Sequence, residues 1–256
     1  MRRLALLAAL LAPAGAAAQA TGDMVRFIAC PVYRDADSGR KSGCWLADEP
    51  TSGARYDVSL SPYKPDWNRE VLVEGRISGA GAGACGAPVL NPVRTSILPG
   101  ACTRHMLPAE GYPGRRYVLP PRNIEPLAIA RAAPPGPFRA RRFTAYFEFD
   151  RAFLVYQYDD FLIDRAVTWI RAARPRKLVV TGFAATIPEL VSGRLIAERA
   201  DVARERADAV AETLRRLVPG LAIEEQTRLA AKPGADLDAD GIAGQSQRRA
   251  EIAVVF

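Results

Sequence analysis

A cluster of prolines divides this chain into two regions and constrains how each can fold. Eight prolines fall within thirty residues, namely Pro108, Pro113, Pro120, Pro121, Pro126, Pro134, Pro135 and Pro137. Such a segment lacks the apolar periodicity that a core element needs, so we expect an extended, semi-rigid spacer over residues 108–138. A chain of 256 residues accommodates two domains. We place them at residues 21–107 and 139–256.

The first twenty residues have the pattern of a secretory signal peptide. Arg2 and Arg3 precede the apolar run Leu4–Leu11, and Ala18–Ala20 places small residues at the −3 and −1 positions of a cleavage site. An uncleaved anchor is the alternative, but the apolar run is too short for a permanent bilayer span. No later segment reaches about 18 uninterrupted apolar residues. We therefore expect an exported periplasmic protein with no transmembrane span in its mature form, with outer-membrane association left open.

Four cysteines, Cys30, Cys44, Cys85 and Cys102, all lie in the first region. An exported protein meets an oxidising compartment, so two disulfides are expected. Four cysteines allow three pairings, and the sequence alone does not choose among them. We favour Cys30 with Cys44 and Cys85 with Cys102, because each pair brackets a hairpin-sized segment. No closely spaced cysteine pair indicates a zinc site, and no metal or cofactor is expected.

The charge pattern does not indicate a nucleic-acid binder. The formal net charge is +7, but most arginines alternate with Asp and Glu instead of gathering with aromatic residues on one face. The denser basic runs, Arg115-Arg116 and Arg139–Arg142, flank the proline cluster. We expect them to be solvated linker ends, with contact to anionic lipid headgroups or wall polymers as the alternative.

The first region has the pattern of a small all-β domain. Turn residues separate four β-type runs, Cys44–Ala47, Tyr56–Leu60, Val71–Ile77 and Pro88–Leu98. The spacing of three of these runs loosely resembles the strands of OB-type barrels over about fifty residues. The sequence therefore predicts a small disulfide-linked all-β domain, with OB-like as the type that the resemblance suggests.

The second region alternates between strand and helix patterns. The residues that carry these patterns are the aromatic strand 143–149, the helix face Leu162, Ala166, Trp169 and Ala173, the strand Arg176–Thr181, and the helix face Ala203, Ala207, Val210, Leu214 and Leu217. Pro219-Gly220 ends the second helix. The order predicts a βαβαββ two-layer sandwich, so that the whole chain belongs to the α+β class. The right-handed crossover rule makes the strands on either side of each helix parallel.

Four short segments, in the same order as in a known family, carry a resemblance to the peptidoglycan-binding domain of OmpA. They are Phe149-Asp150 at a strand end, Gly182-Phe183-Ala184-Ala185 where the family has Gly-His-Thr-Asp, Val202 to Ala207 where it has Leu-Ser-x-x-Arg-Ala, and Gln247 to Ile252 where it has Asn-Arg-Arg-Val-Glu-Ile. The resemblance covers about residues 143 to 256. It implies a non-catalytic domain that binds the cell wall.

The resemblance also implies which side chains would bind the diaminopimelate of the wall peptide. In the family an aspartate faces the ammonium group and an arginine grips the carboxylate with its planar fork. Arg206 takes the arginine position here, with Asp150 and Gly182 as the other ligand-binding candidates. The aspartate position is Ala185, however, and the loss of such a charge partner typically costs about 2–5 kcal/mol. We name Glu189, Glu198 and Asp201 as candidate replacement carboxylates.

Each of these residues also has a simpler structural interpretation. Arg206, beside Glu205, can form surface ion pairs. Asp150 can be the turn residue that follows a strand. For Arg248 and Arg249, at the start of the last strand, a structural role is the interpretation that we favour.

Three further motifs carry no function. Asp236 to Gly241 matches the first half of a calcium loop, but the twelfth position is Gln247 instead of a bidentate Glu. Gly81 to Gly86 is a literal Gly-x-Gly-x-x-Gly, but it precedes Pro88 instead of a helix. His105, the only histidine, has no Gly-x-Ser-x-Gly beside it. We therefore do not expect an enzyme.

Two functions remain in view for a Gram-negative envelope protein of this kind. The first is association with peptidoglycan through the divergent OmpA-like domain, with Arg206 binding the carboxylate of the wall peptide. The second is a periplasmic protein-interaction module, whose OmpA-like domain has lost wall binding and acts as a scaffold for an envelope protein partner.

Overall fold

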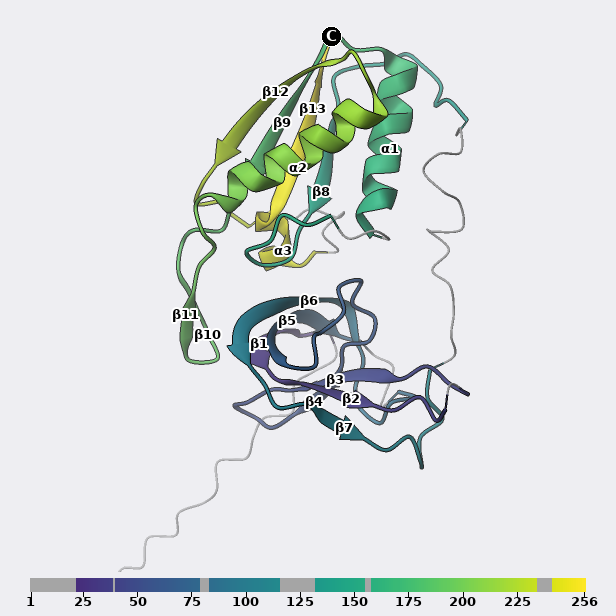
Figure 1. Cartoon of the computed structure of the whole chain (residues 1–256), viewed down its shortest axis with the longest axis vertical. Helices are drawn as coiled ribbons and strands as arrows, with labels where there is room; N and C mark the ends of the chain where they lie inside the picture. Colours follow the sequence, from purple (N-terminus) through teal and green to yellow (C-terminus); the bar gives the residue numbers. More distant parts are fainter. Residues whose placement is uncertain (1–21, 39, 79–82, 116–131, 155–157, 234–240) are drawn as a thin grey trace, which may run out of the picture.

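The structure is a computed structural model of the chain (Figure 1). It describes residues 22–38, 40–78, 83–115, 132–154, 158–233 and 241–256. The signal-peptide pattern of residues 1–20, most of the proline-rich spacer and the calcium-like motif therefore lie outside the described residues.

The N-terminal unit, residues 22–115, is built from seven strands in two sheets. Its strands are β1 (Met24–Ala29), β2 (Pro31–Arg34), β3 (Cys44–Asp48), β4 (Arg55–Asp57), β5 (Arg69–Ile77), β6 (Leu90–Ala101) and β7 (His105–Leu107). One sheet has the order β1-β5-β6 and the other the order β4-β3-β2-β7. Only Cys30 separates β1 from β2, so one run of chain passes through both sheets. A bridge between Asp57 and Val89 links β4 to the start of β6.

The main core of this unit lies between the two sheets. It consists of alternating apolar residues from both sheets, listed here: Val25, Phe27, Ala47, Tyr56, Val58, Val71, Val73, Ile77, Leu90 and Val93. Alternation puts every second side chain of a strand on one face, which is why the apolar runs of the sequence form this core. A smaller cluster around Val32 and Leu46 lies next to one of the disulfides.

Two disulfides are present, but the pairing that we favoured is wrong. Cys30 is bonded to Cys102 and Cys44 to Cys85, with Cα–Cα distances of 5.6 and 6.0 Å. The three-stranded sheet explains the first bond, because β5 pairs with both β1 and β6 and so carries the end of β6 near the end of β1. Proximity along the chain was therefore a poor guide, since the cysteines that pair are brought together by the sheets.

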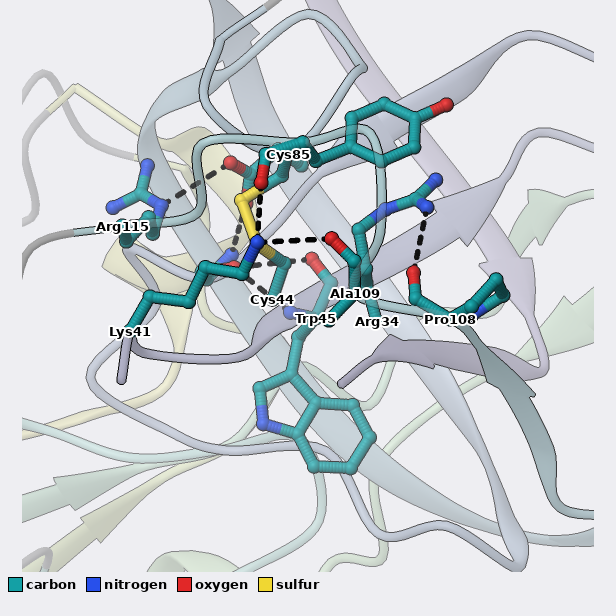
Figure 2. The surroundings of a disulfide bond; sticks show 11 residues. Arg34, Lys41, Cys44, Trp45, Cys85, Pro108, Ala109 and Arg115 are labelled. Atoms are coloured by element: carbon teal, nitrogen blue, oxygen red, sulfur yellow. Dashed lines mark hydrogen bonds and ion pairs between the residues drawn. A yellow bond between two sulfur atoms is a disulfide. The ribbon is translucent and has the colours of Figure 1, made fainter. Parts of the chain in front are cut away.

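The beginning of the proline-rich segment lies against the N-terminal unit beside the Cys44–Cys85 disulfide (Figure 2). Lys41 donates hydrogen bonds from its Nζ to the carbonyl oxygens of Ala109, at 2.9 Å, and Tyr112. Arg34 donates from Nη1 to the carbonyl oxygen of Pro108 at 3.1 Å. Cationic side chains thus hold this segment by its backbone carbonyls. Its first residues belong to the N-terminal unit and not to a free spacer.

Removing either disulfide is expected to destabilise the protein by about 2–4 kcal/mol, because each one restricts a long loop of the unfolded chain. The Cys30–Cys102 loop spans 72 residues and the Cys44–Cys85 loop 41 residues. The paired variant Cys30→Ala/Cys102→Ala should therefore lose as much stability as Cys44→Ala/Cys85→Ala, or slightly more. Urea unfolding of both variants beside the wild type measures the difference, and a Cys44→Ala/Cys85→Ala variant that is clearly the less stable would contradict the loop-length argument.

The C-terminal unit, residues 132–256, contains the helices. Its elements are β8 (Arg142–Tyr146), α1 (Tyr158–Ala173), β9 (Lys177–Phe183), β10 (Glu189–Val191), β11 (Arg194–Ile196), α2 (Val202–Leu217), β12 (Ala222–Arg228), α3 (Ala243–Gln247) and β13 (Arg249–Val255). The main sheet has the order β12-β9-β13-β8, and α1 and α2 pack on one face of it (Figure 1). As the crossover rule requires, β9 and β12 are parallel.

The predicted fold class is wrong. The described chain is mostly β, with thirteen strands in four sheets and three helices, and it is not a simple βαβαββ two-layer α+β sandwich. The segment between β9 and α2 forms the separate hairpin β10–β11. The short helix α3 precedes the last strand. The sequence did not show the hairpin because its strands are only three residues long and Leu190 and Leu195 are 71% and 73% exposed, which leaves Val191 as the one buried side chain of the two strands.

Within the described residues, none of the helices has both the length and the apolar content that a membrane crossing requires.

Candidate functional site

Gly182 lets α2 approach the central strand closely. It lies near the end of β9, and a Cβ atom at this position would meet the backbone oxygen of Ala203 at 1.8 Å. Ala203 and Ala207 present small side chains to the same contact and are fully buried. Gly182, which we named as a ligand-binding candidate, thus has a packing role in the structure. Its close contact with α2 brings the next turn of this helix, which carries Arg206, over the end of the sheet.

Arg206 is completely buried, and every N–H group of its guanidinium is used inside the protein. A guanidinium has five N–H donors. Nε donates to the carbonyl oxygen of Arg151 at 2.9 Å, and Nη1 and Nη2 donate to the carbonyls of Phe183 and Glu148 at 2.7 and 3.0 Å. The remaining two N–H groups bind the carboxylate of Glu198, at 2.9 and 2.5 Å. Arg206 therefore has no donor left for an external carboxylate in this conformation.

The carboxylate of Glu198, like the guanidinium of Arg206, has its hydrogen-bond partners within the protein. Besides the two bonds from the guanidinium, its carboxylate accepts the backbone N–H of Asp150 at 2.8 Å and that of Ala185 at 2.7 Å. Neither side chain of the ion pair is exposed to solvent. Burial raises the pKa of the Glu198 carboxyl, but the hydrogen bonds and charge of Arg206 outweigh burial and hold this pKa below its usual value.

We call this arrangement the carboxylate cradle: the guanidinium of Arg206 and the N–H groups of Asp150 and Ala185. Of the three candidate replacement carboxylates, Glu198 is the one that reaches the cradle. Glu189 instead pairs with Arg26, and Asp201 pairs with Arg199. Glu198 binds the guanidinium of Arg206 itself, the group to which the resemblance assigns a ligand carboxylate.

Asp150 faces away from Arg206. Its backbone has a positive φ of 54°, a conformation that Asp tolerates at turns. Its carboxylate accepts hydrogen bonds from the backbone N–H of Arg199 at 2.8 Å and from the Arg199 Nε at 3.0 Å. The turn interpretation from the sequence therefore describes its geometry, and its backbone N–H is the part that belongs to the cradle.

No protein-family model matches this chain, and no curated protein matches it either. The OmpA-like character of the C-terminal unit therefore remains a resemblance carried by the motifs quoted above.

A strap, residues 184–201, carries Glu198 to the cradle and is attached to the N-terminal unit. Glu189 on β10 pairs with Arg26 on β1, and the hydroxyl of Ser192 accepts the backbone N–H of Ile28 at 3.0 Å. Arg194 on β11 pairs with Glu70 on β5 at 2.7 Å. Figure 1 shows the β10–β11 hairpin of the strap extending from the C-terminal unit alongside the N-terminal one. The strap thus connects the cradle, which lies in the C-terminal unit, to the N-terminal unit.

A second buried ion pair joins the two units directly. Arg248, which lies between α3 and β13, donates from Nη2 to the carboxylate of Glu74 on β5, and both side chains are at most 2% exposed. Arg26 adds a further ion pair to Glu74 at 3.0 Å. Gly244 leaves space for this carboxylate, because a Cβ there would meet the Glu74 Oε1 at 1.9 Å. The structural role that we favoured for Arg248 agrees with this position.

Apolar and polar contacts extend the same interface. A cluster from both units contains Ile28, Leu72, Leu98, Phe149 and Val191. The hydroxyl of Tyr63 donates to the carbonyl oxygen of Tyr146 at 3.1 Å, and the hydroxyl of Ser96 accepts the backbone N–H of Phe149 at 2.9 Å. The two units therefore contact each other through a packed interface as well as through the strap.

Of the three further sequence motifs, His105 and part of the glycine motif lie within the described residues. His105 is exposed on β7, and the described part of the glycine motif, Gly83 to Gly86, forms a turn that holds a disulfide cysteine. Arg249 lies over the ring of Phe183 and pairs with Glu251. Among the described residues there is no group of three or more His, Cys, Asp or Glu side chains that could hold a metal ion.

Glu148 lies next to the cradle and has an unfavourable position for a charge. Burial raises the pKa of its carboxyl, against the lowering effect of the Ile97 backbone hydrogen bond and the charges of Arg151 and Arg248. A group with a raised folded-state pKa stabilises the protein below its unfolded-state pKa and loses this stabilisation as the pH rises through the folded-state pKa. Glu148→Gln should therefore be more stable than the wild type at neutral pH, with a difference that grows as the pH rises above about 4.3. Urea titrations at several pH values measure it, and a constant difference would contradict the argument.

Sequence reasoning missed one further feature, a cluster of aromatic side chains in the N-terminal unit. The rings of Tyr33, Trp45 and Trp67 contact one another in pairs, with centroid distances of 4.6 to 5.0 Å. Tyr33 and Trp45 are register partners on β2 and β3, whereas Trp67 comes from the loop before β5. The two tryptophans are 22 positions apart in the sequence, so no local pattern pointed to the cluster.

Proposed function

We propose that this protein is a non-catalytic interaction module of the cell envelope, whose C-terminal unit acts as a scaffold and does not bind the wall peptide through Arg206. The observation that carries the proposal is the filled carboxylate cradle. All five N–H donors of Arg206 are used within the chain, two of them by Glu198. A wall peptide would have to displace a carboxylate that is already desolvated and hydrogen-bonded.

The energetics favour the internal carboxylate over an external one. Glu198 is covalently part of the chain, so it binds Arg206 without the loss of translational and rotational freedom that a free ligand suffers. Removing it leaves a buried cation without a partner, and breaking a buried pair in this way is strongly destabilising. Two disulfides are compatible with an oxidising compartment, which supports the envelope location.

A sedimentation assay with purified peptidoglycan tests the proposal. The wild-type protein is expected to remain in the supernatant, while an OmpA-family domain with its Asp and Arg intact pellets as the positive control. Because the chain carries a net charge of +7, the assay should be run at about 0.15 M and about 0.5 M salt. Pelleting that disappears at the higher salt reflects general charge attraction and agrees with the proposal. Saturable pelleting that persists at high salt would overturn it in favour of specific wall association.

A further inference from the structure

Five side chains form what we call the aromatic end of the N-terminal unit: Tyr33, Trp45, Trp67, Arg104 and Met106. Tyr33 on β2 is the register partner of Trp45 on β3 and of Met106 on β7, so these three side chains form a row across the sheet. The guanidinium of Arg104 lies 4.1 Å from the centre of the Trp67 ring. In Figure 2 the indole of Trp45 points away from the Cys44–Cys85 disulfide.

This cluster is more open than the core beside it. Trp45 packs against the main core of the unit, yet Tyr33, Trp45 and Trp67 are each only half-buried. Met106 is 43% exposed and Arg104 is exposed. By contrast, the aromatic rings of the main core, Phe27 and Tyr56, are at most 3% exposed. The aromatic end therefore offers apolar surface to solvent.

The aromatic end presents hydrogen-bond donors almost exclusively. Neither indole N–H, of Trp45 or of Trp67, makes a hydrogen bond within the part of the chain that the structure describes. Arg104 is exposed and donates one bond, from Nη2 to the sulfur of Met106 at 3.2 Å. None of the five side chains carries a carboxylate or amide oxygen, and the acceptors are the Tyr33 hydroxyl and the weakly accepting sulfur of Met106, which already binds Arg104. A matching ligand has many acceptors and few donors.

The ring geometry favours a ridged ligand over a flat one. The rings of the three pairs are inclined to each other by 58° to 65°, so their faces do not form a common plane. One face of Trp67 is covered by Arg104. Sugar rings would need open, flat ring faces and acceptors for their hydroxyl groups, and the cluster provides neither.

A proline-rich segment has the complementary properties. Proline lacks a backbone N–H and leaves its carbonyl oxygens free, and a polyproline II helix makes no internal hydrogen bonds. Aromatic-lined grooves are a known way to bind such helices. The N-terminal unit already holds proline-containing backbone by the same chemistry elsewhere, because Arg34 and Lys41 donate to the carbonyls of Pro108 and Ala109.

We propose that the aromatic end binds a proline-rich segment of a partner protein in the polyproline II conformation. This inference rests on the proposed role as an interaction module and specifies its partner. Proline rings pack against the exposed parts of the Trp45 and Trp67 indoles, and the two indole N–H groups donate to the carbonyls of the bound segment. Arg104 fixes the orientation of Trp67 and supplies a further donor.

A fluorescence titration with decaproline tests the inference. The chain has three tryptophans, and Trp169 is buried in the core of the C-terminal unit. Trp169→Phe therefore leaves only the two indoles of the aromatic end as reporters. In this background, decaproline is expected to change the emission saturably, whereas a glycine-serine peptide of equal length should not. Calorimetric titration of the wild-type protein with decaproline measures the affinity independently of tryptophan fluorescence and should give the same value.

Two variants locate the binding. Trp67→Ala is expected to weaken decaproline binding at least about tenfold, as central aromatic anchors of an interface do. Arg104→Ala, an exposed position that should not affect folding, is expected to weaken it about threefold. Leu190→Ser is the matched control, since it removes an exposed apolar side chain from a different element and should leave the affinity unchanged.

The inference would be overturned if decaproline did not bind saturably, or if chitin oligosaccharides bound in its place. It would also be overturned if Trp67→Ala and Arg104→Ala bound decaproline with the affinity of the wild type, or if Leu190→Ser lost binding. The peptidoglycan assay separates this inference from the function that it rests on. Wild-type protein that stays in the supernatant but does not bind decaproline would leave the scaffold function standing and remove only the proposed partner.

Discussion

Replacing Glu198 with alanine is expected to lower the free energy of unfolding by about 3–5 kcal/mol. The substitution leaves the Arg206 guanidinium fully buried without its counter-charge. It also removes the acceptor for the backbone N–H groups of Asp150 and Ala185. A loss of this size is a large part of the 5–15 kcal/mol that typically stabilises a folded domain. The variant should therefore unfold at a much lower urea concentration than the wild type.

Two comparisons make this measurement specific to the buried pair. Glu189→Ala, on the same strap, removes an ion pair to Arg26 in which both side chains are about one-third exposed, and it should cost no more than about 1 kcal/mol. The double variant Glu198→Leu/Arg206→Met replaces the pair with apolar side chains and should recover much of the loss. If Glu198→Ala were as stable as Glu189→Ala, Arg206 would have to reach water in solution, and the filled-cradle argument would fail.

The same pair makes stability depend on acid. Since Arg206 lowers the folded-state pKa of Glu198, the stabilisation is complete above the unfolded-state pKa of about 4.3 and disappears as the pH falls through the folded-state pKa. The stability difference between the wild type and Glu198→Ala should accordingly narrow below about pH 4. Glu148 has the opposite dependence, so the two carboxyls can be told apart by their pH profiles.

The elements of the C-terminal unit were largely visible in the sequence, because their apolar residues repeat with the period of a buried face. Ala207, Val210 and Leu214 repeat on one face of α2, and all three are buried. The β10–β11 hairpin gave no such signal, since each strand has three residues and Leu190 and Leu195 face solvent, while Val191 alone is buried. The predicted fold class was therefore wrong where strands, such as β10 and β11, form through tertiary contacts and show no apolar periodicity in the sequence.

The site could be predicted in its parts but not in its arrangement. The motif comparison pointed to Arg206 and to a missing aspartate, and it named Glu198 as one of three possible carboxylates. Only the fold shows that Glu198 binds the arginine itself. Glu74 directly follows the apolar run Val71–Val73 on β5, but its partner Arg248 lies 174 positions away. Long-range pairs of this kind cannot be read from spacing.

Replacing Glu74 with alanine is expected to destabilise the protein by about 3–5 kcal/mol and to separate the unfolding of the two units. Glu74 is the carboxylate that Arg26 and Arg248 share across the interface. Without Glu74, the guanidinium of Arg248 loses its buried ion-pair partner and keeps its hydrogen bond to the side-chain oxygen of Gln245. In the variant the unpaired charge of Arg248 therefore disfavours the packing of the two units, whereas in the wild type its ion pair with Glu74 connects them.

The three tryptophans allow the separation to be observed. Trp45 and Trp67 report on the N-terminal unit and Trp169 on the C-terminal unit, so single-unit reporters are obtained with Trp169→Phe or with Trp45→Phe/Trp67→Phe. In the wild-type background the two urea transitions should coincide, as expected for one cooperative structure. With Glu74→Ala they should have different midpoints. Arg194→Ala, which removes an exposed ion pair between the same units, should leave them coincident. Coincident transitions in Glu74→Ala as well would mean that the apolar contacts around Phe149, and not the buried charges, couple the two units.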